Sequence, residues 1–189
     1  MTRRFTLFCS IFAAASLSSA KADNYKIDPA HSNVLFKVGH FGVGNVYGRF
    51  DTFSGNFVFD QKDPTKDSVS FEISTDSVDS NFPDRDKHLK SPDFLNSKQF
   101  PTATFKSTSF KKVDEKNYEV AGNFTLHGIT KPVTVSVQVI GSGPGPKGEP
   151  RLGTESTVTL KRSDFDVKTF LPAVTDDVQL TIAIEGVKQ

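Results

Sequence analysis

Two stretches of alternating apolar and polar residues between positions 118 and 139 constrain the fold more than any other feature of the chain. The first has apolar or small residues at Tyr118, Val120, Gly122, Phe124 and Leu126, and the second has valines at 133, 135, 137 and 139. Successive strand side chains point to opposite faces, so each stretch predicts a strand with one buried and one solvated face. Gly128 and Pro132 favour a turn between them, and we predict a hairpin.

The same alternation recurs along the rest of the chain. Its inward positions are Val34, Phe36 and Val38; Phe53, Gly55, Phe57 and Phe59; Val69, Phe71 and Ile73; Ala103 and Phe105; Ser156, Val158 and Leu160; and Val178, Leu180, Ile182 and Ile184. Buried parallel strands would read as continuous apolar runs separated by crossover helices, and neither pattern is present. We therefore predict an all-β fold of about eight antiparallel strands that closes into a barrel, with a two-sheet sandwich as the alternative.

Three segments interrupt this alternation. Residues 39–48 contain four glycines and predict a bend or bulge, and residues 141–150 are so rich in Gly and Pro that they predict an exposed loop. Residues 75–101 lack strand alternation, and Ser91-Pro92-Asp93 has the pattern of a helix start. We expect short helices there, which either form a lid over the barrel mouth or cross the surface as a solvated connection.

The first 22 residues have the pattern of an export signal. Arg3 and Arg4 precede an apolar stretch over residues 7–17, and Ala20-Lys21-Ala22 provides a small-x-small cleavage motif. The apolar stretch is shorter than the ~20 residues of a membrane span. We predict a cleaved signal peptide (1–22), one domain (23–189) and a periplasmic location. Because Cys9 lies in the signal, the mature chain excludes disulfides, thiolate catalysis and Cys-based zinc sites.

The charge of the mature chain limits its partners. Removing residues 1–22 takes away three basic residues and no acidic ones, which leaves 20 basic against 22 acidic residues and a net charge of −2. Nucleic-acid binding would need a basic face, and strong attachment to anionic lipid would need a basic surface. We therefore predict no nucleic-acid partner.

Phenylalanine dominates the apolar composition: 15 of the 18 Phe residues lie after position 22, Trp is absent and Met occurs only at position 1. Such rings either fill a solid core or line an apolar tube, because small barrels do both. The alternation selects six candidates for lining a cavity: Phe36, Phe57, Phe71, Phe105, Phe124 and Phe165. Four residues of the 75–101 segment are candidates for contacts at the mouth: Arg85, Asp86, His88 and Phe94.

Metal binding and catalysis find less support. The four histidines, His31, His40, His88 and His127, have neither i, i+4 nor His-x-His spacing, so we expect them to form hydrogen bonds at the barrel ends rather than a metal site. We find no nucleophile elbow, paired-carboxylate spacing or phosphate loop. For residues 162–164 (Arg-Ser-Asp), we expect a strand end in which Asp164 pairs with a cation such as Arg85. No enzymatic activity is predicted.

Several blocks of the sequence, in order, resemble motifs of the YceI-like family. They are residues 25–32 (YKIDPAHS), 38–43 (VGHFGV), 48–50 (GRF), 85–89 (RDKHL), 100–105 (FPTATF) and 122–132 (GNFTLHGITKP). Tyr25 stands where the family often has Trp, and Asp166 stands where Gly is common. The resemblance implies an eight-stranded, antiparallel, lipocalin-like barrel of exported bacterial proteins. Its interior would hold a long isoprenoid chain or a similar lipid, including a quinone tail.

From residues and resemblance together we predict a periplasmic carrier of a long apolar lipid, which is a polyisoprenoid, an isoprenoid quinone or a fatty-acid-like ligand. The bound lipid or quinone is a ligand, and we predict no further cofactor. Transient contact with a membrane or a membrane electron carrier is expected, and a homodimer is left open. Two alternatives remain: a ligand-free interaction module for a membrane electron carrier, and an enzyme of isoprenoid or quinone metabolism.

Overall fold

The computed structural model describes residues 22–189, so the predicted signal peptide lies, except for its last residue, outside the described residues. The strands are β1 (Asp23–Ile27), β2 (Asn33–His40), β3 (Gly44–Phe50), β4 (Phe53–Phe59), β5 (Ser68–Ser74), β6 (Val78–Asp79), β7 (Thr102–Lys112), β8 (Asn117–Leu126), β9 (Ile129–Pro144), β10 (Pro150–Lys161) and β11 (Val174–Lys188). In the part of the chain that the structure describes, they are accompanied by one α-helix, α1 (Pro83–Leu89), and by four 3₁₀ turns, η1 (Pro29–His31), η2 (Pro64–Lys66), η3 (Thr75–Ser77) and η4 (Arg162–Phe165). Within residues 22–189, no helix is both long and apolar enough to cross a membrane.

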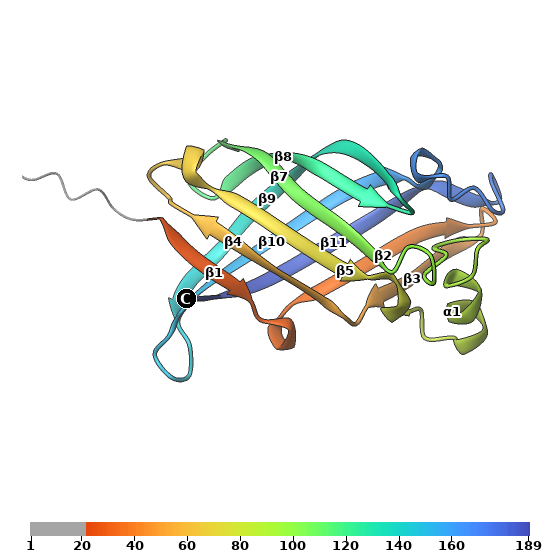
Figure 1. Cartoon of the computed structure of the whole chain (residues 1–189), viewed down its shortest axis with the longest axis horizontal. Coiled ribbons are helices and arrows are strands. Elements are labelled where there is room, and N and C mark those ends of the chain that lie inside the picture. Colours follow the sequence, from red (N-terminus) through yellow and green to blue (C-terminus); the bar gives the residue numbers. More distant parts are fainter. Residues whose placement is uncertain (1–21) are drawn as a thin grey trace, which may run out of the picture.

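The strands close into an antiparallel barrel (Figure 1). Neighbours follow the order β1-β4-β5-β7-β8-β9-β10-β11, and β11 pairs again with β1, so eight strands form a ring. This confirms the predicted eight-stranded antiparallel barrel, and the two-sheet alternative is wrong. The predicted hairpin is β8–β9, whose register runs from Leu126↔Ile129 to Asn117↔Gln138.

Three positions of the ring are each occupied by two strand segments in succession. The first position, beside β11, is occupied by β2 and β1. β2 pairs with residues 174–183 of β11, and β1 pairs with residues 186–188. In the next position, β3 pairs with β2 and β4 pairs with β1. In the third, β6 pairs with β3 and β5 pairs with β4. Short interruptions between the halves, such as η1 and η3, therefore bend the wall without opening the barrel.

The two ends of the barrel differ in what connects the strands (Figure 1). At one end lie the start of β1, the end of β11 and the β4–β5, β7–β8 and β9–β10 connections; we call it the terminus end. At the other, the lid end, lie the β2–β3 and β8–β9 turns, residues 162–173 and residues 80–101, which contain α1 and are named the lid segment. The non-strand chain is therefore concentrated at the lid end.

The structure corrects three local predictions. In residues 39–48 only 41–43 form a turn, because β2 and β3 pair up to His40↔Gly44. Residues 141–150 are not all loop, since β9 and β10 pair out to Pro144↔Pro150 and only 145–149 connect them. A neighbouring strand thus overrides the weak strand propensity of Gly and Pro.

The third correction concerns the helix expected after Ser91. The hydroxyl of Ser91 accepts a hydrogen bond from the backbone N–H of Asp93 at 3.3 Å, as a helix cap would. The chain nevertheless forms a series of turns, in which the N–H groups of Phe94 and Asn96 both donate to the Ser91 carbonyl. Asn96 then adopts a left-handed conformation with φ 47°, which ends the turn.

Candidate functional site

The barrel interior contains two adjoining cavities. We call them the terminus-end chamber and the lid-end chamber. Four side chains line both chambers, and we call them the waist: Ile73, Phe124, Leu160 and Leu180.

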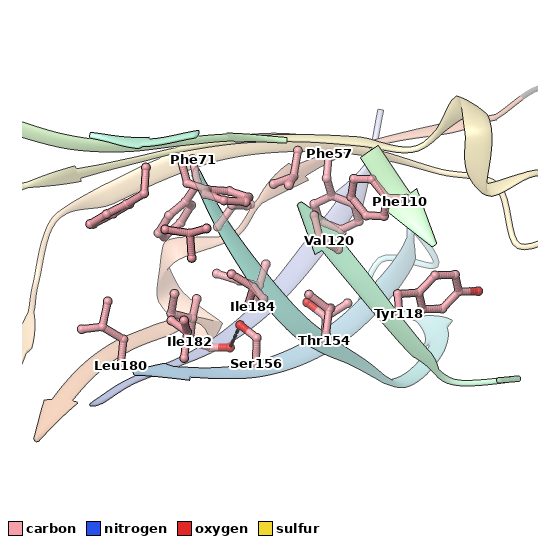
Figure 2. A pocket seen from close by; sticks show the side chains of 18 of the residues that line it. Phe57, Phe71, Phe110, Tyr118, Val120, Thr154, Ser156, Leu180, Ile182 and Ile184 are labelled. Carbon is pink, nitrogen blue, oxygen red and sulfur yellow. Dashed lines mark hydrogen bonds between the residues drawn. The ribbon is translucent and has the colours of Figure 1, made fainter. Parts of the chain in front are cut away.

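The terminus-end chamber is lined almost entirely by apolar side chains. Figure 2 shows Phe57, Phe71 and Phe110 on one side of it, and Leu180, Ile182 and Ile184 on the opposite side. Its polar lining residues are Tyr118, Thr154 and Ser156, and the hydroxyl of Tyr118 is directed away from the cavity (Figure 2). Among residues 22–189, no charged side chain lines this chamber.

All six predicted cavity phenylalanines line the interior. Phe57, Phe71 and Phe105 line the terminus-end chamber, Phe36 and Phe165 line the lid-end chamber, and Phe124 lines both. The rings of Phe124 and Phe165 meet edge to face, with centroids 5.4 Å apart. The structure therefore brings these residues together, whereas their contact with a ligand stays a prediction.

Three of these rings lie over glycines of other strands. A Cβ atom added to Gly48 would collide with the ring of Phe36, and one added to Gly122 would collide with that of Phe105. A Cβ atom added to Gly186 would likewise collide with the ring of Phe57. Inward glycines thus make room for the large rings within a narrow barrel.

Of the four predicted mouth residues, one lines a chamber. Phe94 does so at the lid end, together with its neighbours in the lid segment, Leu89 and Leu95. His88 lies outside the chamber lining; its Nε2 is 3.0 Å from the carboxylate of Asp93, and its ring contacts Phe94 edge to face. The lid segment therefore covers the lid-end chamber with its apolar side chains.

Arg85 and Asp86 of α1 both bond to Ser80, the first residue of the lid segment. Arg85 donates to the Ser80 hydroxyl at 2.7 Å and to its carbonyl at 2.6 Å. Asp86 accepts from the Ser80 backbone N–H at 2.8 Å and also from the hydroxyl. The predicted pairing of Asp164 with a cation such as Arg85 is wrong, because Asp164 forms no ion pair within residues 22–189 and Arg85 bonds to Ser80 instead.

The sequence interpretation missed Arg162 as an interior residue. It is 6% exposed and lines the lid-end chamber. Its Nε donates to the Thr175 carbonyl at 2.9 Å, Nη1 to that of Val167 at 2.9 Å and Nη2 to that of Val174 at 2.8 Å. Burial lowers the pKa of this guanidinium. Extending the alternation of Val158 and Leu160 by two positions would have pointed Arg162 inward.

The histidines do not gather at one place. His31 pairs with Asp28, His40 and His127 lie against Phe41 and Phe100, and His88 is in the lid segment. Asp28, His31 and Glu185 do bring potential ligand atoms within 4.8 Å of one another. Nη1 of Arg151 already bonds to both carboxylates of this group, at 2.8 Å from Asp28, so a cation is present there.

A buried carboxyl group lies at the terminus end. Asp67 is 9% exposed; its Oδ1 accepts from the backbone N–H of Asp60 at 2.6 Å, and its Oδ2 has no hydrogen-bond partner within the described residues. Burial raises the pKa of Asp67 to about 6. Asp67 lines neither chamber.

Exposed apolar side chains surround the lid end. Phe41 and Val43 in the β2–β3 turn, Phe82 in the lid segment and Phe170 before β11 are all more than half exposed. Phe41 and Phe170 both have positive φ, 51° and 63°, which is uncommon for bulky residues. The backbone N–H of Phe41 donates to Ala173, so the two connections are joined. This end therefore presents an apolar rim to solvent.

The model of the YceI-like domain matches residues 25–186 of the chain. The chain belongs to the YceI-like family. It is 46% identical over 176 residues to Protein YceI of Escherichia coli O157:H7, covering 92% of each chain. A UPF0312 protein of Pectobacterium atrosepticum is 45% identical over 177 residues, which are 93% of this chain and 92% of that protein.

Solved structures agree with this assignment. BcnA of Burkholderia cenocepacia superposes with a TM-score of 0.77 at 26% identity, covering 84% of this chain and 98% of BcnA. A YceI protein of Campylobacter jejuni superposes with a TM-score of 0.73 at 27% identity, covering 80% of this chain and 90% of that protein. A polyisoprenoid binding domain from Saccharophagus degradans shares the fold, with a TM-score of 0.68 at 16% identity, covering 87% of this chain and 98% of that domain.

The two departures from the family pattern are accommodated locally. Tyr25 is buried and stacks on Phe57 with ring centroids 4.9 Å apart, so it fills an interior position as a larger ring would. Asp166 takes the left-handed conformation that favours glycine, with φ 62°. Its carboxylate pairs with Lys168 at 2.7 Å.

Proposed function

We propose that this protein binds a long apolar lipid inside its barrel and carries it through the periplasm. The observation that supports this most is the succession of two apolar chambers along the barrel. Two chambers in series suit an extended chain better than a compact ligand. Each buried methylene contributes about 0.8 kcal/mol, so a chain of dozens of carbons gains ample affinity without polar contacts.

The ligand we propose is a polyisoprenoid, an isoprenoid quinone or a fatty-acid-like chain. The Saccharophagus degradans domain that shares this fold is a polyisoprenoid binding domain. At 16% identity this likeness gives the fold alone. The support for the ligand class therefore comes from the apolar lining of the two chambers and from their succession along the barrel.

Binding rather than catalysis suits the chemistry of the chambers. Within residues 22–189, Arg162 is the one charged side chain that lines either of them. Proton transfer to a ligand needs a titratable group near neutrality, and a guanidinium stays protonated. The export pattern of residues 1–22 supports a periplasmic location.

We further propose that the lid end makes transient contact with a membrane. A lipid with little solubility in water must be collected from a bilayer, and the apolar rim lies at the same end as the lid segment. Exposed apolar patches often mark such interaction sites. The rim would allow the lid-end chamber to receive the lipid directly.

Native mass spectrometry of the purified protein, followed by organic extraction, tests the proposed function. We expect a bound polyprenyl or quinone-like lipid at about one per chain. A protein that is empty and also fails to take up added polyprenol would contradict the proposal. It would mean that the phenylalanines fill a solid core, and the interaction-module alternative would then be favoured.

A further inference from the structure

Arg162 is held in a way that leaves part of its hydrogen-bonding capacity unused. A guanidinium has five N–H donors, and three of those of Arg162 bond to the backbone carbonyls of Val167, Val174 and Thr175. One N–H each on Nη1 and Nη2 has no partner among the described residues. Because Arg162 is 6% exposed and lines the lid-end chamber, these donors lie where water has little access.

The positive charge of Arg162 is also uncompensated by a direct partner. Within residues 22–189, no carboxylate forms an ion pair with it. The carboxylate of Asp176, whose charge acts on Arg162, instead accepts from the backbone N–H and hydroxyl of Ser163 at 2.9 and 2.8 Å. Backbone carbonyls offset a buried charge only in part, and a charge without a counter-ion in an apolar interior is costly.

The opposite chamber offers no comparable polar group. Its lining lacks charged side chains within the described residues, and one of its three polar side chains, Ser156, is directed toward the carbonyl of Ile182. In the lid-end chamber the other polar residue is Thr75, whose hydroxyl donates to the Phe100 carbonyl at 2.7 Å. A ligand with one polar end therefore meets free donors in the lid-end chamber, on Arg162.

We infer that Arg162 binds an anionic head group, a phosphate or a carboxylate, of the lipid in the lid-end chamber. The inference rests on the proposed lipid-binding function and deepens it by giving the head-group class and the direction of the ligand. The head lies next to Arg162 beneath the lid segment, and the tail passes the waist into the terminus-end chamber. A planar guanidinium suits this role because two of its N–H groups can contact one phosphate or carboxylate.

The test compares two lipids that share a tail and differ in charge, a polyprenyl monophosphate and the polyprenol of the same length. We expect the protein to bind the phosphate about 10- to 100-fold more tightly, as a charge-assisted hydrogen bond would give. Arg162→Met removes this preference and still binds the polyprenol. Arg49→Met, at an exposed arginine that pairs with Asp51 and Asp79, keeps the preference.

The outcomes separate the inference from the proposed function. Equal affinity of the unaltered protein for the two lipids would overturn the role of Arg162 while leaving lipid binding intact. Binding of neither lipid would contradict the proposed function itself. A preference that persists in folded Arg162→Met, with melting monitored by circular dichroism, would also overturn the inference.

A second measurement needs no variant, in case Arg162→Met fails to fold. Stearic acid carrying a nitroxide either near its carboxylate or near its methyl end is added to ¹⁵N-labelled protein. We expect the first label to broaden the amide signals of Val167 and Val174, which lie beside Arg162. The second label broadens those of Val120 and Val135 in the terminus-end chamber. The reverse pattern would overturn the proposed orientation.

Discussion

Arg151 lies at the start of β10 and Arg162 directly follows its end, and their guanidinium groups are held in opposite ways. Arg151, at the terminus end, contacts three carboxylates, those of Asp28, Glu149 and Glu185. Arg162, at the lid end, contacts three backbone carbonyls and lines a chamber. An arginine whose charge is balanced by carboxylates, like Arg151, fastens strand ends. An arginine bound only to backbone carbonyls, like Arg162, keeps a positive charge that a ligand can neutralise.

The largest effect we predict concerns the terminus-end chamber. Phe71→Asp places a carboxylate in the terminus-end chamber, whose lining has no positive charge within residues 22–189 to offset it, so lipid binding should weaken by at least about 100-fold. Lipid titration measures the loss, and Tyr47→Asp at an exposed position of β3 is the control. If Phe71→Asp unfolds the domain to the same degree as it abolishes binding, the phenylalanines form a solid core.

The second prediction concerns Asp67, a buried ionisable residue that, unlike Arg162, lines neither chamber. The folded pKa of Asp67 is about 6, above its usual value of 3.8, so ionisation costs stability as pH rises through this window. Asp67→Asn should raise the free energy of unfolding by at most about 3 kcal/mol above pH 6, by little near pH 4, and leave lipid affinity unchanged. Urea unfolding at both pH values measures this.

Asp63→Asn is the matched control for that prediction. Asp63 is in the same connection, but hydrogen bonds from Thr65 and Lys66 lower its pKa, so removing its charge should not stabilise the protein. Equal stabilisation by the two variants would show that the general acidity of this connection, and not the burial of Asp67, is responsible.

The third prediction compares exposed apolar side chains at the two ends of the barrel. Phe41→Ser combined with Val43→Ser should reduce binding to phosphatidylcholine vesicles several-fold in a flotation assay, because these side chains belong to the lid-end rim. Val113→Ser, at an exposed turn of the terminus end, should have no effect. Absence of vesicle binding by the unaltered protein, or equal loss in both variants, would contradict membrane contact at the lid end.

The smallest effect concerns Asp28, one of the three carboxylates that pair with Arg151. Hydrogen bonds from His31 and Arg151 lower the pKa of Asp28 from 3.8 to about 2. Its contribution to stability is therefore fully present above pH 4 and is lost as pH falls through about 2. Asp28→Asn should lower the urea midpoint slightly at pH 6 and much less at pH 2, without changing the head-group preference of the lipid site. A change in that preference would contradict the division of roles between the two arginines.

Strand positions could be predicted from the sequence because the alternation of buried and exposed side chains is local. Phe57, Phe71 and Phe105 were placed inside on this basis alone, and they line the terminus-end chamber. The absence of crossover helices favoured a closed barrel, and the family motifs such as residues 122–132 implied it again. The closure itself depends on pairing between β1 and β11, more than 150 residues apart.

Other features depended on contacts that no local pattern contains. The Gly- and Pro-rich ends of β9 and β10 are strands because each supplies a partner for the other. The turns after Ser91 depend on the backbone N–H of Leu95 donating to Leu89, within a segment packed over the lid-end chamber. Arg162 was missed because a charged residue was assigned to the surface, although the alternation of β10 continued to it.

The glycines beneath the phenylalanine rings affect how the barrel can change during evolution. Phe36 over Gly48 and Phe105 over Gly122 each form a unit in which the ring occupies the space that a second side chain would need. The bore of the tube is therefore set by pairs of positions. A homologue that binds a thicker or thinner lipid must change both residues of a pair together, so the phenylalanine and glycine positions are expected to covary.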